Sequence, residues 1–152
     1  MIELNHILVP TDFSKSGRAA LKYAVTLADE FGSAVHLLHV VEPMPPGVLM
    51  SRIPVEELRD GMKKNAEEQM AEVRGIWSEY NFPVTEVIKE GIPFVEIIKF
   101  AKDNDVDLII MGTHGRGAIQ HALMGSVAEK IVRKAPCPVL TVRDPEHEFV
   151  HP

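Results

Sequence analysis

Short apolar segments alternate with amphipathic segments along most of this 152-residue chain. Residues 107–111 are nearly all apolar, a composition typical of a parallel strand that is covered on both faces. Strands that alternate with helices predict a parallel sheet with helices on both sides. The expected strands are residues 7–9, 34–41, 84–89, 107–111 and 139–142.

Helical spacing and helix-ending residues predict four helices between these strands. The first is capped by Asp12 or Ser14 and ends at Gly32. The second begins at Pro54, carries an apolar face as far as Tyr80 and ends before Pro83. Gly61 and Gly75 weaken this second helix locally. Two shorter helices are expected at residues 91–102 and 127–135.

Residues 42–53 are rich in proline and methionine, and their prolines predict a loop without regular structure. The apolar side chains of this loop are compatible with a lid or with a surface that binds a partner. Packing over the crevice of the domain itself is the more common outcome for such a segment, and the sequence leaves the role of this loop open.

The predicted fold class is α/β, with one three-layer α/β/α domain over residues 1–143 and a flexible tail at 144–152. With strand order 3-2-1-4-5, the crevice of the five-stranded parallel sheet lies between the first and fourth strands. Those strands end at Pro10-Thr11-Asp12 and at residues 112–115, which therefore mark the expected ligand site.

Charge and composition exclude several classes of function. With 16 basic and 22 acidic residues, the net charge of −6 argues against binding to nucleic acid. No signal peptide and no membrane insertion are expected, and the single Cys137 fits a reducing cytoplasm. The seven histidines are scattered without the spacing of metal ligands, so no protein-held metal is expected.

A glycine pattern follows the fourth predicted strand. Gly112 and Gly115 are followed, after nine intervening residues, by Gly125-Ser126 at the start of a helix. Small residues at such a place allow backbone N–H groups to approach a phosphate, and a helix N-terminus favours negative charge. A Walker A loop is excluded because no lysine precedes Ser126, and the G-x-G-x-x-G fingerprint of dinucleotide-binding proteins is also absent.

With these motifs the chain resembles the universal stress protein family, in the branch whose ATP-binding pattern is G-x2-G-x9-G-[ST]. The resemblance extends over nearly the whole chain, without departure at the positions that carry the pattern. The matching segments are ILVPTDFS (7–14), LHVV (38–41), IIMGTHG (109–115), GSVAE (125–129) and PCPVLTV (136–142).

The resemblance implies a fold like that of the adenine nucleotide alpha hydrolases, and it implies a ligand: ATP, or AMP or ADP, with Mg²⁺. The Asp12 region is expected to face the ribose or the metal, and the main chain of Val40 to hold the adenine. The glycine loop and the following helix start are expected to enclose the phosphates. The implied nucleotide-binding residues are Pro10, Thr11, Asp12, Val40, Met111, Gly112, His114, Gly115, Arg116, Gly117, Gly125, Ser126 and Val127.

Several of these residues have a second, purely structural interpretation. Ser126 and Glu129 form an S-x-x-E capping box, and Asp12 is also a candidate helix cap. Arg116 matches phosphate geometry but is compatible with a solvated loop, and Gly117 with simple loop flexibility.

The function expected is a nucleotide-binding module in the stress response, with little or no hydrolysis. Phosphoryl transfer requires a positioned nucleophile and strong cationic stabilisation, and no catalytic residue is evident beyond Asp12. A slow ATP hydrolase or phosphoryl-transfer enzyme, and a flavodoxin-like electron carrier, are the alternatives. The family resemblance also implies a homodimer through residues 139–142, and an unidentified protein partner is expected.

Overall fold

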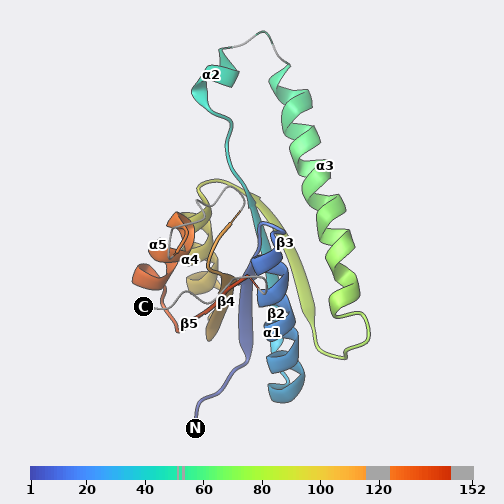
Figure 1. Cartoon of the computed structure of the whole chain (residues 1–152), viewed down its shortest axis with the longest axis vertical. Helices are drawn as coiled ribbons and strands as arrows, with labels where there is room; N and C mark the ends of the chain where they lie inside the picture. Colours follow the sequence, from blue (N-terminus) through green and yellow to red (C-terminus); the bar gives the residue numbers. More distant parts are fainter. Residues whose placement is uncertain (51, 53, 116–123, 145–152) are drawn as a thin grey trace.

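The computed structural model describes residues 1–50, 52, 54–115 and 124–144 of the chain. They form a five-stranded parallel sheet of order β3-β2-β1-β4-β5, as predicted (Figure 1). A flavodoxin-like sheet has the order 2-1-3-4-5, so this order disfavours the electron carrier. The strands are β1 (His6–Pro10), β2 (Ala34–Val41), β3 (Val84–Glu90), β4 (Leu108–Gly112) and β5 (Val139–Val142).

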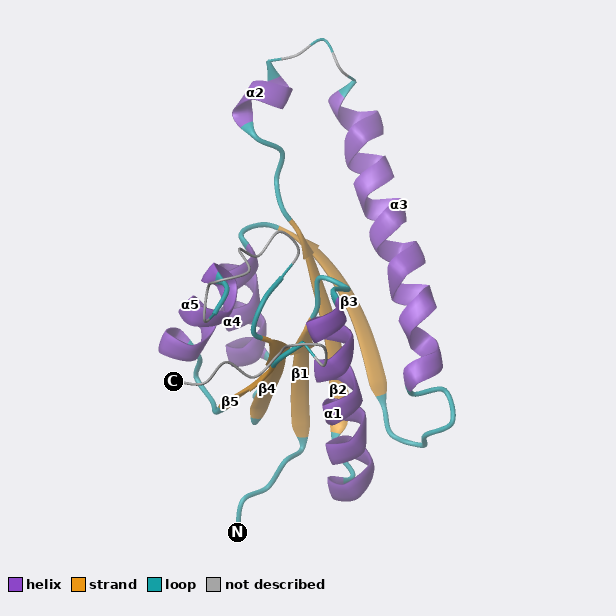
Figure 2. Cartoon of the chain, viewed as in Figure 1, coloured by secondary structure: helices purple, strands orange, loops and turns teal. Residues whose placement is uncertain are grey.

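Helices cover both faces of the sheet, which confirms the three-layer α/β/α architecture (Figure 2). On one face, α1 (Lys15–Phe31) and α3 (Val55–Val73) pack against the alternate strand residues that include Ile7 and Val9. On the other face, α4 (Pro93–Asp103) and α5 (Ser126–Lys134) pack against the set that includes Leu8. This alternation of buried side chains is the period of two that a strand imposes.

The first helix begins and ends as its sequence predicts. Of the two candidate caps, Ser14 caps α1: its side-chain oxygen accepts from the N–H of Gly17 at 3.2 Å. Gly32 ends the helix in a left-handed conformation, at φ 68°.

The prediction for the second long helix is wrong at its C-terminal end. The α-helix stops at Val73 and continues as one 3₁₀ turn, η1 (Arg74–Ile76). Gly75 falls within this turn, where a residue of poor helix propensity favours the departure from α geometry. Trp77 lies beyond the helix but still packs against the core, and for this reason the apolar spacing continued past the helix end.

The prediction that the proline-rich loop has no regular structure is wrong in part. Residues Pro46–Leu49 form a one-turn helix, α2, because proline is compatible with the first helical turn. The α2 helix does not line the crevice: α2 and the first half of α3 extend beyond the sheet (Figure 1), and Met50 is 89% exposed.

The placement of the buried residues along α3 accounts for this projection. The helix has 19 residues and spans about 28 Å, but only its C-terminal part is packed against the sheet. The buried residues of α3 begin only at Ala66. The preceding loop must therefore rise away from the sheet to reach Val55. None of the described helices is long and apolar enough to cross a membrane.

Candidate functional site

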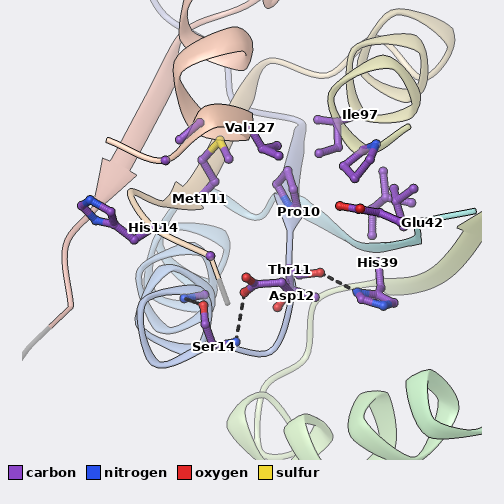
Figure 3. A pocket seen from close by; sticks show the side chains of 18 of the residues that line it. Pro10, Thr11, Asp12, Ser14, His39, Glu42, Ile97, Met111, His114 and Val127 are labelled. Atoms are coloured by element: carbon purple, nitrogen blue, oxygen red, sulfur yellow. Dashed lines mark hydrogen bonds between the residues drawn. The ribbon is translucent and has the colours of Figure 1, made fainter. Parts of the chain in front are cut away.

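A cavity of about 620 Å³ lies at the carboxyl ends of β1, β2 and β4 (Figure 3). It is the crevice expected from the strand order, and most of the predicted site residues line it. Arg116 and Gly117 lie outside the described residues. The predicted residues that line the cavity are Pro10, Thr11, Asp12, Val40, Met111, Gly112, His114, Gly115, Gly125, Ser126 and Val127.

The turn from β1 to α1 is held by its own side chains. Thr11 Oγ1 accepts from the N–H of Phe13, and Asp12 Oδ1 accepts from the N–H of Ser14, each at 3.0 Å. Phe13 has a φ of 63°, which is rare for an aromatic residue and costs about 1–3 kcal/mol. A buried ring and two side-chain hydrogen bonds therefore maintain a strained turn at the edge of the cavity.

The carboxylate of Asp12 lies close to the glycine loop. A Cβ atom placed on Gly115 would be 2.6 Å from Asp12 Oδ2, so any side chain at this position would displace the carboxylate. The carboxylate of Asp12 is thus adjacent to the glycine loop where phosphates are predicted to bind.

Gly112 and Gly125 serve the fold of this loop as well as the cavity. A Cβ on Gly112 would lie 2.4 Å from Ser16 Oγ and 3.0 Å from the nitrogen of Gly17, so only glycine lets β4 approach α1 this closely. The N–H of Gly125 donates to the carbonyl of Thr113 at 2.7 Å. Gly125 therefore closes the loop with its own amide, and the amides that follow it in α5 are the better candidates for a phosphate.

The capping-box interpretation of Ser126 is wrong. Gly125 is the N-cap of α5, its carbonyl accepts from the N–H of Glu129 at 2.9 Å, and Ser126 is the first helical residue. The contact with Thr113 sets the helix start one residue earlier than the local pattern predicted. The first amides of a helix have no partner within it and carry its positive end, and here they border the cavity at Ser126 and Val127.

The main chain of Val40 points into the crevice, as strand register shows. The carbonyl of Leu38 accepts from Thr11 on the β1 side, and that of Val41 accepts from Gly91 on the β3 side. Because backbone groups alternate in direction along a strand, the N–H and C=O of Val40 point to the β1 side. The β1–β2 ladder ends where Pro10 pairs with Leu38, so Val40 lies two residues beyond the end of this ladder.

Sequence reasoning missed one wall of the cavity. Met62, Asn65, Ala66 and Gln69 line it from α3, at helical spacing on the same face as the residues buried in the core. The spacing was visible, but only the tertiary path of α3 shows that this face passes the cavity. The other unpredicted lining residues are Ser14, Gly17, Leu38, His39, Val41, Glu42, Pro93, Ile97, Thr113, Met124 and Ala128.

Among the residues that the structure describes, neither Cys137 nor a cluster of metal-ligating side chains contributes to this site. Burial and, secondarily, the charge of Asp107 raise the pKa of the Cys137 thiol, which disfavours the reactive thiolate. Cys137 is half-buried against the α4–α5 core, as expected for a packed residue. No group of three or more His, Cys, Asp or Glu in the described part of the chain is arranged to hold a metal ion.

Comparison with known proteins identifies the chain's relatives. Residues 3–143 match the model of the universal stress protein family. Universal stress protein MJ0531 of Methanocaldococcus jannaschii is 34% identical over 142 residues, which are 93% of this chain and 84% of that protein. The structure of hypothetical protein MJ0577 has a TM-score of 0.85 at 33% identity, covering 96% of this chain and 100% of that one.

Two more distant structures of the same fold contain adenine nucleotides. A universal stress protein in complex with cAMP has a TM-score of 0.70 at 21% identity, covering 92% of this chain and 97% of that one. The universal stress protein from Archaeoglobus fulgidus in complex with dAMP has a TM-score of 0.64 at 22% identity, covering 93% and 99%. At this identity the likeness is one of fold.

Proposed function

This chain belongs to the universal stress protein family, and from that premise we propose that it binds an adenine nucleotide, ATP above all, at the carboxyl ends of β1, β2 and β4. One observation carries the proposal. A single cavity is bordered by the backbone of Val40, which lies beyond the end of the β1–β2 ladder, by the carboxylate of Asp12 and by the N-terminus of α5. These groups suit a base, a ribose and a phosphate chain respectively.

The apolar part of the cavity suits the adenine. Pro10, Ile97, Met111 and Val127 gather on one side of it, next to the β2 strand that carries Val40 (Figure 3). From there a nucleotide that crosses Asp12 would bring its phosphates to Gly115 and the start of α5. The relatives of the same fold in complex with cAMP and dAMP support this class of ligand.

Mg²⁺ fits the site as a companion of the nucleotide. This ion is commonly bound by one or two carboxylates together with substrate phosphates. Asp12 is the carboxylate that would hold it, beside Gly115. The ion would neutralise charge between that carboxylate and the phosphates, and AMP, with fewer phosphate charges, depends on it less.

We propose that the bound nucleotide is a regulatory ligand in a stress response, with little or no turnover. The described lining residues include no lysine or arginine, whereas phosphoryl transfer relies on strong cationic stabilisation. The alternative is a slow ATP hydrolase or phosphoryl-transfer enzyme in the same cavity. Phosphate release at several turnovers per second, lost in Asp12→Ala, would favour that alternative.

The Gly115→Val variant tests nucleotide binding. Its side chain would occupy the space beside Asp12 Oδ2 and block approach to the loop backbone. We expect ATP affinity measured by calorimetry to fall at least tenfold, about 1.4 kcal/mol. Gly47→Val is a matched control, because a Cβ at Gly47 meets nothing within 4 Å and this residue does not line the cavity. Unchanged affinity in a folded Gly115→Val protein would refute the site.

We also propose a homodimer through β5, in place of a monomer whose tail covers this edge. The strand is at the edge of the sheet, and Leu140 is 39% exposed on it. An uncovered edge pairs readily with another strand unless it is blocked. Leu140→Lys is expected to give the mass of a monomer by sedimentation, and wild-type protein that of a dimer. A monomeric wild-type chain, unchanged by removal of the tail after Arg143, would end this proposal.

A further inference from the structure

The side chain of His39 is hydrogen-bonded to Thr11, the residue that follows β1. Its Nδ1 atom lies 2.8 Å from the carbonyl oxygen of Thr11 (Figure 3). A carbonyl oxygen only accepts hydrogen bonds, so Nδ1 is the donor and the imidazole is held with its proton on that nitrogen. His39 also lines the cavity, directly before Val40 in β2.

Thr11 is held by β2 at both of its backbone groups. Its N–H donates to the carbonyl of Leu38 at 2.9 Å, and its C=O accepts from His39. The β1–β2 ladder ends at Pro10 opposite Leu38, so the His39 side chain continues the attachment one step beyond the ladder. The centroids of the Phe13 and His39 rings are 4.7 Å apart, so the two rings are in contact.

This attachment bears on the position of the Asp12 carboxylate. Phe13 is in the left-handed region, a conformation that persists only when its surroundings enforce it. His39 supplies part of that enforcement, through the carbonyl of Thr11 and through ring contact with Phe13. If His39 released Thr11, the turn would be free to relax and to move the carboxylate away from Gly115.

We propose that His39 is a positioning residue for the nucleotide: by donating from Nδ1 to Thr11 it holds the β1–α1 turn in the shape that places Asp12 in the cavity. This inference rests on the proposed function. It also predicts where in the side chain of residue 39 the hydrogen-bond donor must be, because only a donor close to the main chain reaches the Thr11 carbonyl. An asparagine amide nitrogen corresponds to Nδ1 of histidine, and a glutamine amide nitrogen to Nε2.

Three variants test whether the donor must be in the Nδ1 position: His39→Asn, His39→Gln and His39→Leu. We expect His39→Asn to keep ATP and AMP affinity within about threefold of wild type by calorimetry. His39→Gln and His39→Leu are expected to lose about tenfold or more. His36→Asn is the matched control, since His36 lies in the same strand as His39 but does not line the cavity. Nitrogen-15 NMR of wild-type imidazoles is expected to show the His39 proton on Nδ1.

The outcomes separate the inference from the function on which it rests. A wild-type protein that binds neither ATP nor AMP overturns the proposed function. A wild-type protein that binds, with His39→Gln and His39→Leu folded and equal to it in affinity, overturns the inference alone. Equal losses in His39→Asn and His39→Gln, or a neutral His39 ring with its proton on Nε2 and none on Nδ1, would also overturn the role of the Nδ1 donor.

Discussion

Two segments that border the same cavity acquire their shapes by opposite means. The turn at residues 11–14 relies on side chains, with Thr11, Asp12 and Ser14 each accepting a hydrogen bond from a backbone N–H. The described ends of the β4–α5 loop rely on the absence of side chains, at Gly112, Gly115 and Gly125. One wall therefore offers a fixed carboxylate, and the other brings bare backbone close to it.

The difference predicts how each wall responds to substitution. A turn held by side-chain hydrogen bonds tolerates a replacement that keeps the donor or acceptor in place. A backbone held in close contact tolerates no added atom, whatever its polarity. The free energy lost when a glycine is substituted also depends on the atoms that the new side chain would meet. Gly112 faces the buried start of α1, whereas Gly115 faces the end of the Asp12 side chain.

Gly112→Ala is expected to have the largest effect on stability. Its Cβ would lie 2.9 Å from Ser16 Cβ and 3.0 Å from the backbone nitrogen of Gly17, so β4 and α1 must separate. We expect the free energy of unfolding to fall by about 3 kcal/mol in urea titrations.

Gly61→Ala is the matched control for this measurement. Gly61 lies in the exposed half of α3, and a Cβ there meets nothing within 4 Å. Because alanine is the better helix former, this change is expected to raise the free energy of unfolding by about 1 kcal/mol. Similar losses in both variants would contradict the contrast between packed and open glycines.

Ser16→Ala is expected to have an intermediate effect. The Ser16 hydroxyl donates to the carbonyl of His114 at 2.6 Å and connects α1 to the glycine loop. Because Ser16 is 3% exposed, the loss is expected to cost about 1 kcal/mol in unfolding free energy. In the Gly112→Ala background, Ser16→Gly removes the two nearest clashing atoms, so it should restore part of the lost stability. A strictly additive loss would show that Ser16 is not the obstacle.

The sheet order was predictable because strand–helix alternation leaves few arrangements of a parallel sheet. The residues around the crevice were predictable for the same reason, since they follow β1 and β4 directly. The start of α5 was not, because the contact between Gly125 and Thr113 overrides a locally valid S-x-x-E pattern. Tertiary contacts of this kind leave no periodic trace in the sequence.

The contribution of α3 to the cavity was hidden for a related reason. Asn65 and Gln69 look like ordinary polar residues of a surface helix, and only the tertiary path of the packed half of α3 brings them to the cavity. His39 was equally inconspicuous within an apolar strand. Its partner, the Thr11 carbonyl, comes from a turn whose shape depends on the left-handed Phe13.

The opposite end of β2 carries a contrasting histidine, and it provides the smallest predicted effect. His36 Nε2 lies 3.2 Å from Nδ1 of His6, while His36 Nδ1 is buried without a hydrogen-bond partner among the described residues. Burial, and secondarily the charge of His6, lower the pKa of His36 below 6.5. The His36 ring also makes a T-shaped contact with the Phe100 ring, and the Lys89 ammonium lies 5.4 Å from the centroid of that Phe100 ring.

A lowered histidine pKa makes the folded state bind fewer protons than the unfolded chain. As the pH falls through 6.5, the unfolded chain takes up a proton that folded His36 resists, so this residue lowers stability in acid and not above neutrality. We expect the urea midpoint of wild type to drop more between about pH 7.5 and about pH 5.5 than that of His36→Asn. His6→Gln removes only the secondary cause and should reduce the drop less. Identical drops of the urea midpoint in wild type and His36→Asn would show that the burial of His36 does not destabilise the folded state in acid. The two ends of β2 would then not differ in this respect.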